Sequence, residues 1–170
     1  MKLPLNTDLS GKVAVVTGAG GVLCSMFAKA LAQAGAKVAV LDLNLEAAQA
    51  VAEEIEKNGG VAKAYKTNVL EKESLQETHD AVVADLGTCD ILINGAGGNN
   101  PRATTDKEYY ESGDIDADTI SFFDLDPSGV EFVFNLNFIG TLLPTQIFAQ
   151  DMVDKEGCNI LNISSMNAFT

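Results

Sequence analysis

A run of apolar residues that ends in a glycine-rich turn is the feature of this sequence that most constrains its fold. Val13 to Thr17 are mostly β-branched and are bounded by Gly11 and Gly18, a pattern typical of a buried strand. The apolar residues that follow recur at helical spacing: Val22, Leu23, Met26, Phe27, Ala30, Leu31 and Ala34. Gly35 comes next, where glycine commonly ends a helix. The sequence therefore predicts a strand, a tight turn and a helix in succession.

The same alternation continues along the chain. Further strands are predicted at Val38–Leu41, Val61–Thr67, Ile91–Ile93 and Asn159–Ile163. Apolar residues at helical spacing predict further helices, one that begins near Leu45 and one that begins before Leu75. Ser128 is predicted to cap a long apolar helix that continues through Phe148 and Met152. Strands that alternate with helices form a parallel sheet covered on both faces. We expect an α/β, Rossmann-like doubly wound fold with about five strands, in one domain over residues 1–170.

The turn after the first strand has the residues that a diphosphate requires. Backbone N–H groups at a helix N-terminus lack partners, and the helix dipole is positive there. Gly18, Gly20 and Gly21 leave room for a pyrophosphate to reach those groups. We therefore predict that this turn binds a dinucleotide cofactor.

Asp42 closes the second apolar run, Lys37 to Asp42, within reach of an adenosine ribose. A carboxylate there accepts hydrogen bonds from both ribose hydroxyls and repels a 2′-phosphate. The turn also has no Arg or Lys to receive that phosphate. Both features favour NAD over NADP. The alternative is that Asp42 caps the helix that begins after Asn44.

Charge and composition exclude several classes of partner. The formal net charge is −13, which disfavours nucleic acid and anionic membrane surfaces. No apolar run approaches the length of a membrane span, and the first eight residues lack the apolar core of a signal peptide. We therefore expect a cytoplasmic protein. Three cysteines lie far apart without metal-ligand spacing and are expected to be reduced, mostly buried thiols: Cys24, Cys89 and Cys158.

The segment from Gly95 to Asp126 shows little periodicity, and residues 98–126 are expected to form a long acidic loop. Its acids are Asp106, Glu108, Glu111, Asp114, Asp116, Asp118, Asp124 and Asp126, and Lys107 is set among them. We favour a solvated loop. A metal site is the alternative, but the spacing matches no Ca²⁺-binding loop, so no metal is predicted.

Four ordered motifs resemble those of the short-chain dehydrogenase/reductase family. They are Thr17-Gly-Ala-Gly-Gly-Val-Leu-Cys24, Asn94-Gly-Ala-Gly97, Asn137-Phe-Ile-Gly140 and Ile163-Ser-Ser165. A finer pattern around Asn94–Pro101 and Asn135–Gln146 resembles the subgroup that interconverts D-mannonate and D-fructuronate. The resemblance covers essentially the whole chain.

The resemblance implies roles for individual residues. Gly18 through Leu23, including Val22, would hold the pyrophosphate, and Asn68 and Val69 would lie beside the adenine. Asn94, Gly95, Ala96 and Gly97 would line the cofactor after the fourth strand and brace the sheet. Asn137 would position a water for proton relay, and Ser165 would hydrogen-bond the reacting oxygen. The family is often oligomeric, so the intact protein is expected to be a homo-oligomer, a dimer or tetramer.

Two departures from the family pattern stand out. Val22 and Cys24 occupy positions where the family usually has glycine, and a reactive role for Cys24 is a minor alternative. The family also uses a Tyr followed four residues later by Lys, and Tyr65, Tyr109 and Tyr110 are not followed in that way. We therefore expect a longer protein, of which this chain lacks the C-terminal part of the fold, and expect these 170 residues alone to be inactive.

The function implied is hydride transfer between NAD and a sugar acid of the D-mannonate type. Arg102 is the candidate for the substrate carboxylate, and the alternative is that it pairs with a nearby acid. His79 is expected to be solvated or packed and not to act as a base. A dehydrogenase of another polyol or keto-sugar acid, of the gluconate 5-dehydrogenase type, and a non-catalytic NAD-binding fragment are the competing functions.

Overall fold

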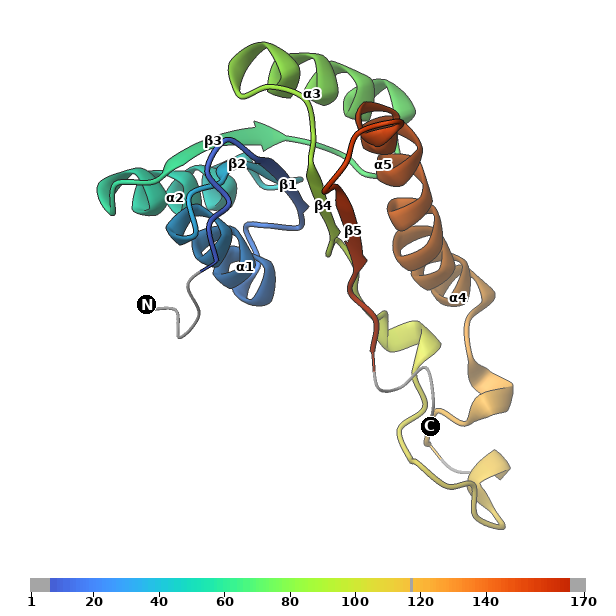
Figure 1. The fold of residues 1–170 in the computed structure, drawn as a ribbon. Coiled ribbons are helices and arrows are strands. Elements are labelled where there is room, and N and C mark those ends of the chain that lie inside the picture. Colours follow the sequence, from blue (N-terminus) through green and yellow to red (C-terminus); the bar gives the residue numbers. More distant parts are fainter. Residues whose placement is uncertain (1–6, 117, 166–170) are drawn as a thin grey trace.

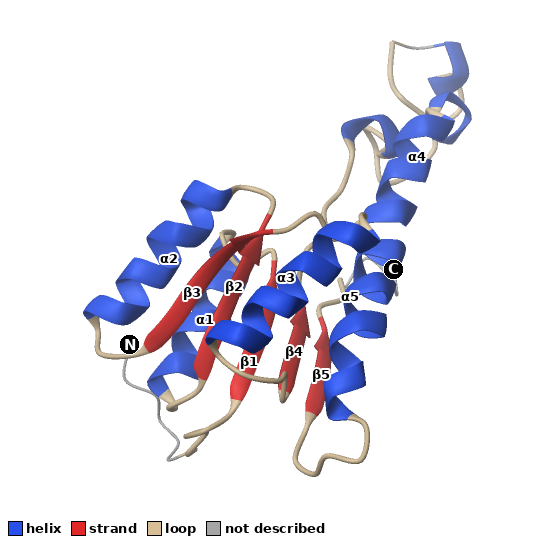
Figure 2. Cartoon of the chain, turned by 90° about the horizontal axis from the view of Figure 1, so that it is seen from above, coloured by secondary structure: helices blue, strands red, loops and turns tan. Residues whose placement is uncertain are grey.

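A computed structural model describes residues 7–116 and 118–165 of the chain. The segments 1–6 and 166–170 lie outside the described residues, so most of the N-terminal segment inspected for a signal peptide does as well. Five strands form one parallel sheet in the order β3-β2-β1-β4-β5 (Figures 1 and 2). Their bounds are Val13–Thr17 for β1, Lys37–Asp42 for β2, Val61–Lys66 for β3, Ile91–Asn94 for β4 and Asn159–Asn162 for β5. The predicted Rossmann-like arrangement is confirmed.

Helices cover both faces of this sheet (Figure 2). Two of them, α1 (Val22–Gln33) and α2 (Leu45–Lys57), pack on one face with Ala14 and Val16 of β1. On the other face, α3 (Lys72–Asp85) and α5 (Gly140–Phe148) pack with alternate residues of the same strand, Val13 and Val15. Because successive strand residues point to opposite faces, all five residues of β1 are buried.

The predicted long apolar helix is present but is not uniform. It consists of α4 (Pro127–Phe134), a π-helical segment η4 (Asn135–Ile139), α5, and a 3₁₀ turn η5 (Ala149–Met152). The prediction that Ser128 caps this helix is wrong by two residues. Asp126 is the N-cap, and its carboxylate accepts a hydrogen bond from Ser128 N at 2.8 Å. Pro127 at the first helical position favours this start, because its fixed φ suits a helix and it has no N–H to satisfy.

The helical run from Pro127 to Met152 is long and apolar enough to cross a membrane, when judged by length and composition alone. This differs from the prediction that no apolar run approaches the length of a membrane span. The core helices of soluble proteins also pass this test. Here Ile147 and Phe148 are buried against the sheet, although only 22% of the most apolar window is buried overall.

The segment 98–126 projects from the sheet as a separate lobe (Figures 1 and 2), which we name the acidic lobe. It contains three short 3₁₀ turns: η1 (Pro101–Ala103), η2 (Asp114–Asp116) and η3 (Phe122–Asp124). Asp114 is buried, and it accepts hydrogen bonds from Lys107 Nζ at 2.7 Å and from Glu111 N at 2.8 Å. The expectation of a purely solvated loop is therefore wrong at this residue. In the parts of the chain that the structure describes, no three His, Cys, Asp or Glu side chains are grouped to hold a metal.

A buried carboxylate joins three segments at the amino end of the sheet. Asp90 accepts hydrogen bonds from Val13 N at 2.8 Å and Lys12 Nζ at 3.2 Å, and it pairs with Lys155 Nζ at 2.9 Å. Burial raises the pKa of Asp90, but these three hydrogen bonds outweigh it and hold that pKa below its usual value. The contact therefore ties β1, β4 and the loop before β5 together.

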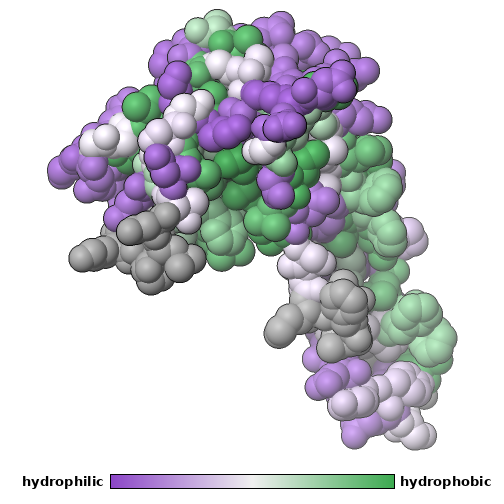
Figure 3. Space-filling view, viewed as in Figure 1, coloured by the Kyte–Doolittle hydropathy of each residue, from purple (hydrophilic) through white to green (hydrophobic). Residues whose placement is uncertain are grey.

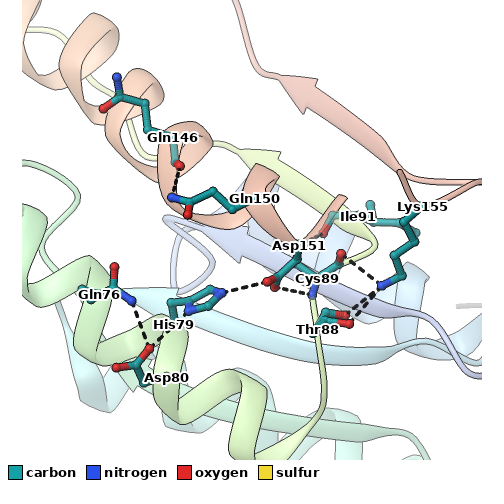
Figure 4. A network of polar contacts seen from close by, with 10 residues as sticks. All are labelled: Gln76, His79, Asp80, Thr88, Cys89, Ile91, Gln146, Gln150, Asp151 and Lys155. Atoms are coloured by element: carbon teal, nitrogen blue, oxygen red, sulfur yellow. Dashed lines mark hydrogen bonds and ion pairs between the residues drawn. The ribbon is translucent and has the colours of Figure 1, made fainter. Parts of the chain in front are cut away.

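A second polar network lies beside it and includes His79 (Figure 4). His79 Nε2 lies 3.1 Å from Asp151 Oδ1, and the ring packs edge-on against Phe148 with centroids 5.4 Å apart. Asp151 also accepts a hydrogen bond from Cys89 N at 2.8 Å. Of the two roles expected for His79, packing is the one observed. Burial, with Asp151 and Asp90 nearby, raises the pKa of Cys89 to about 12, as expected for a buried thiol.

Candidate functional site

A crevice of about 700 Å³ lies at the carboxyl ends of the strands. In open α/β sheets this edge is where ligands bind. The structure brings together on its walls eleven of the thirteen residues predicted from the sequence to lie beside a cofactor: Gly18, Gly20, Gly21, Val22, Leu23, Asp42, Asn68, Val69, Gly95, Ala96 and Gly97. The other two, Ala19 and Asn94, are not among the lining residues.

The glycine turn is held against the segment that follows β4. Gly18 has a φ of +65°, and a Cβ there would lie 2.9 Å from Ala96 Cα. Thr17 Oγ1 accepts hydrogen bonds from Gly95 N at 3.0 Å and Ala96 N at 3.1 Å. Only glycine fits this close approach of two main chains at a positive φ. The turn therefore presents main-chain groups at the N-terminal end of α1, whose N-cap is Gly21.

Asp42 is fixed by two main-chain donors. Its Oδ2 accepts a hydrogen bond from Gly20 N, and its Oδ1 accepts one from Asn44 N, both at 2.9 Å. Asn44, not Asp42, is the N-cap of α2, and its side chain accepts a hydrogen bond from Ala47 N. The alternative that Asp42 caps this helix is therefore wrong. The carboxylate joins the end of β2 to the glycine turn.

The two departures from the usual glycine pattern are accommodated differently. Val22 is 90% exposed, so its side chain lies clear of the sheet. Cys24 is buried, and its Sγ occupies the place that a Cβ on Gly95 would take. Burial, and then the nearby Asp42, raise the pKa of the Cys24 thiol. A raised pKa disfavours the thiolate, so the minor alternative of a reactive Cys24 has no support here.

The loop after β3 forms another wall of the crevice. Asn68 Oδ1 accepts a hydrogen bond from Leu70 N at 3.1 Å, and Asn68 N donates to Ser74 Oγ at 3.0 Å. These contacts fix the loop in a tight Asx-type turn before α3. Val69 is buried and lies beside Gly140 of α5.

Asn94 lies at the end of β4 and is 2% exposed. Its Nδ2 donates to Thr145 Oγ1 at 2.8 Å and to Asn162 Oδ1 at 2.9 Å. The side chain thus joins β4 to α5 and β5. Its Oδ1 has no hydrogen-bond partner within the described segments.

Asn137 and Ser165, the two residues predicted to act on substrate, do not line the crevice. Asn137 lies in η4, where its Oδ1 accepts from Gly98 N at 3.1 Å and its Nδ2 donates to Gly98 O at 2.8 Å. A π-helical turn re-aims side chains and is frequent at functional sites. Ser165 is exposed and follows β5, three residues beyond Asn162.

Arg102 lies at the base of the acidic lobe and is 62% exposed at its side chain. Its Nη1 lies 3.3 Å from Asp126 Oδ2. Pairing with a nearby acid, one of the two alternatives for this residue, is therefore observed. Binding of a substrate carboxylate stays a prediction.

Eight further residues line the crevice, and none of them was assigned to the cofactor from the sequence: Cys24, Leu43, Asn44, Ala47, Thr67, Leu70, Phe132 and Leu136. Most are sequence neighbours of predicted residues. Phe132 and Leu136 are not, since they come from the α4–η4 run. Their spacing of four residues on an apolar helix was the available signal, but that spacing gave no indication of which face meets the crevice.

A parallel sheet ordered 3-2-1-4-5, with a glycine turn after β1 and a carboxylate after β2, defines a dinucleotide-binding fold of the Rossmann type. The chain belongs to the short chain dehydrogenase family, which matches residues 12–170.

Similar proteins agree with this assignment. The chain is 61% identical over 170 residues to an "Uncharacterized oxidoreductase" of Haemophilus influenzae, covering all of this chain and 59% of that one. It is 44% identical over 168 residues to the "Uncharacterized oxidoreductase UxuB" of Bacillus subtilis, covering 99% and 59%. A crystal structure of "a putative D-Mannonate oxidoreductase" of Haemophilus, with bound NAD, superposes with a TM-score of 0.93 at 62% identity, covering 97% and 59%. The chain thus spans 59% of the length of each of these three relatives.

Proposed function

We propose that this chain binds NAD in the crevice and is the cofactor-binding part of an NAD-dependent oxidoreductase. The observation that carries the proposal is the position of Asp42, whose two oxygens are held by Gly20 N and Asn44 N beside the glycine turn. A fixed carboxylate at this point suits a ribose diol and opposes a 2′-phosphate. The related Haemophilus structure, which holds NAD, supports the same cofactor.

The crevice residues fit the parts of such a cofactor. The pyrophosphate would be held by main chain at Gly20 and Gly21 and along the first turn of α1, near Val22 and Leu23. Asn68, Val69, Ala96 and Gly97 would line the remaining wall, and Asn94 would act by holding β4 against α5. Bound NAD supplies the hydride acceptor or donor. This chain would bind and orient it.

Asn137 and Ser165 are the proposed catalytic residues of this chain. The amide of Asn137 is already bound to Gly98, which fixes the helix close to the segment that lines the crevice. Ser165 would hydrogen-bond the reacting oxygen of a substrate and stabilise charge that develops there. The tyrosine and lysine implied by the family resemblance are not provided by Tyr65, Tyr109 or Tyr110.

We propose a sugar acid of the D-mannonate/D-fructuronate type as the substrate of the whole protein. The name of the Haemophilus relative supports this class. Arg102 would bind the substrate carboxylate, and to do so it would exchange its surface pairing with Asp126. Exposed ion pairs contribute little to stability, so the exchange costs little. We further propose that the protein is cytoplasmic and that it is a homo-oligomer. Exposed apolar side chains on the helical run, such as Phe138 and Leu142, support the oligomer, and hydrophobic residues gather along this run in Figure 3.

Calorimetric titration with NADH and NADPH tests the cofactor proposal. We expect NADH to bind and NADPH to bind at least tenfold more weakly, since a phosphate would meet the Asp42 carboxylate. Failure of NADH to bind would overturn the proposal. A panel of sugar acids and neutral polyols with NAD⁺, run with wild-type protein and Arg102→Ala, tests the substrate. Loss of affinity for acids alone supports Arg102, and equal effects on acids and polyols refute it.

A second candidate is an NAD-binding module without turnover. The observation that favours it is that no tyrosine in the chain is followed by lysine four residues later. NADH binding without turnover on any substrate of the panel would support this candidate. Turnover would exclude it.

A further inference from the structure

The crevice has an apolar wall that neither the glycine turn nor Asp42 explains. Phe132 and Leu136 lie one helical turn apart on the α4–η4 run, and both line the crevice. Phe132 is 45% exposed, so a large part of its ring is available for contact. Phe134, two residues further along the same helix, is 69% exposed and does not line the crevice. The two phenylalanines therefore differ in their relation to the site.

Gly140 brings this wall into contact with the loop after β3. A Cβ on Gly140 would lie 3.0 Å from Val69 Cγ2, 3.7 Å from Leu70 Cδ2 and 3.8 Å from Leu136 Cδ1. Without a side chain at this position, the loop and the helical run close on one another. Val69, Leu70 and Leu136 thus meet in one place, and Phe132 extends the same apolar surface by one turn.

The position of this surface indicates which part of a dinucleotide it receives. β3 is the neighbour of β2, so the loop after β3 lies on the far side of Asp42 from β1 and its glycine turn. A ligand with its diphosphate at the turn and its ribose at Asp42 places its base beside the β3 loop. An adenine base is flat and uncharged, and aromatic side chains stack on such bases.

We propose that Phe132 is an adenine-contact residue and that the base stacks on its ring, with Leu136 and Val69 behind it. The inference rests on the proposed function, because it names a further contact within the same site. Binding would cover the exposed part of the Phe132 ring, so the contact would contribute to affinity for the base and not for the nicotinamide half.

The test compares a ligand that carries the adenosine half with one that lacks it. Dissociation constants are measured for NADH and for reduced nicotinamide mononucleotide, which lacks the adenine together with its ribose and one phosphate. The proteins are the wild type, Phe132→Ala and the control Phe134→Ala. We expect Phe132→Ala to weaken NADH binding about tenfold, the effect of removing one stacking platform. The mononucleotide should be unaffected, and Phe134→Ala should change neither constant. Equal losses for both ligands, or for both variants, would overturn the proposal.

Two conservative variants distinguish stacking on the ring from apolar contact alone. Because both keep a large side chain at position 132, they also control for misfolding. Phe132→Tyr keeps the flat ring and should bind NADH as the wild type does. Phe132→Leu keeps most of the apolar volume but loses the flat face. This variant should lose most of the tenfold contribution that Phe132 makes to NADH affinity. Wild-type affinity in Phe132→Leu would refute stacking. If wild-type protein fails to bind NADH, the proposed function itself fails, whereas full affinity in Phe132→Ala removes only this inference.

Discussion

The carboxylate of Asp42 and the main-chain N–H of Gly20 are joined by a hydrogen bond of 2.9 Å, although 22 residues separate them in the sequence. This bond couples the end of β2 to the turn after β1. A Cβ on Gly20 would lie 3.0 Å from the Asp42 carboxyl carbon and 2.8 Å from Ala47 Cβ. The turn is therefore shaped for glycine by Asp42 as well as by any phosphate.

Asp42→Ser should change the cofactor preference. The substitution removes the acceptor of the ribose hydroxyls and the charge that opposes a 2′-phosphate, so NADH binding should weaken about tenfold and NADPH binding should improve. Titration with both cofactors measures the ratio. Glu46→Gln is the matched control, because it removes an exposed charge in the first turn of α2 without touching Asp42. A similar change of ratio in that control would show a general charge effect and contradict the prediction.

Gly95→Ala should destabilise the protein because its Cβ would collide with Cys24 Sγ. Overpacking of this kind costs about 1–3 kcal/mol. Cys24→Gly in the same chain should restore much of the loss, because it vacates the occupied space. Denaturant unfolding of the two single variants and the double variant gives the coupling energy. Additive effects would show that the two residues do not share one space.

Asp90 should make stability depend on acid pH. Its pKa is lowered in the folded state, so the carboxylate stabilises the fold at pH above its unfolded value of about 4. That contribution is lost as pH falls through the lowered pKa of the folded state. Asp90→Asn should therefore lower the free energy of unfolding by about 2 kcal/mol at neutral pH, since Lys12 and Lys155 lose their partner. The difference from wild type should shrink in acid, and a constant difference would contradict the prediction.

His79→Ala should loosen the contact between α3 and η5. The variant loses the hydrogen bond to Asp151 and the edge contact with Phe148, at a cost of about 1–2 kcal/mol. Gln76→Ala is the control on the same helix, because Gln76 contacts only the exposed Asp80 in the network of Figure 4. Thermal unfolding should separate the two variants, and equal Tm values would refute a structural role for His79.

Local pattern was sufficient for most of the fold. All five strands and the helices α1, α2 and α3 follow from short-range periodicity and from glycines that end elements. The π-helical segment was not predictable in this way, and neither was the contact of its Asn137 with Gly98, 39 residues away. The interior of the acidic lobe was missed for a similar reason. Asp106 pairs with Ile120 through both its main chain and its side chain, and the intervening sequence has no periodicity to show it.

The residues of the candidate site also divide into those that local pattern predicts and those that depend on tertiary contacts. Residues at the ends of strands, such as Gly18 and Asp42, could be placed from the sequence, because parallel strands bring their carboxyl ends to one edge. Asn94 could be placed at that edge, but its hydrogen bonds to Thr145 and Asn162 depend on tertiary packing. Phe132 was not predicted as a site residue, because helical spacing identifies the apolar face of a helix but not the part of the structure that this face contacts.

The two ends of the acidic lobe are tied to each other at its base, through a hydrogen bond from Asp126 N to Arg102 O at 3.0 Å. The chain therefore leaves and re-enters the domain at nearly the same point. Because the entropy of closing such a loop rises only slowly with its length, residues between these two can be gained or lost in evolution at little cost to folding. Relatives that share the sheet are thus free to diverge in length here.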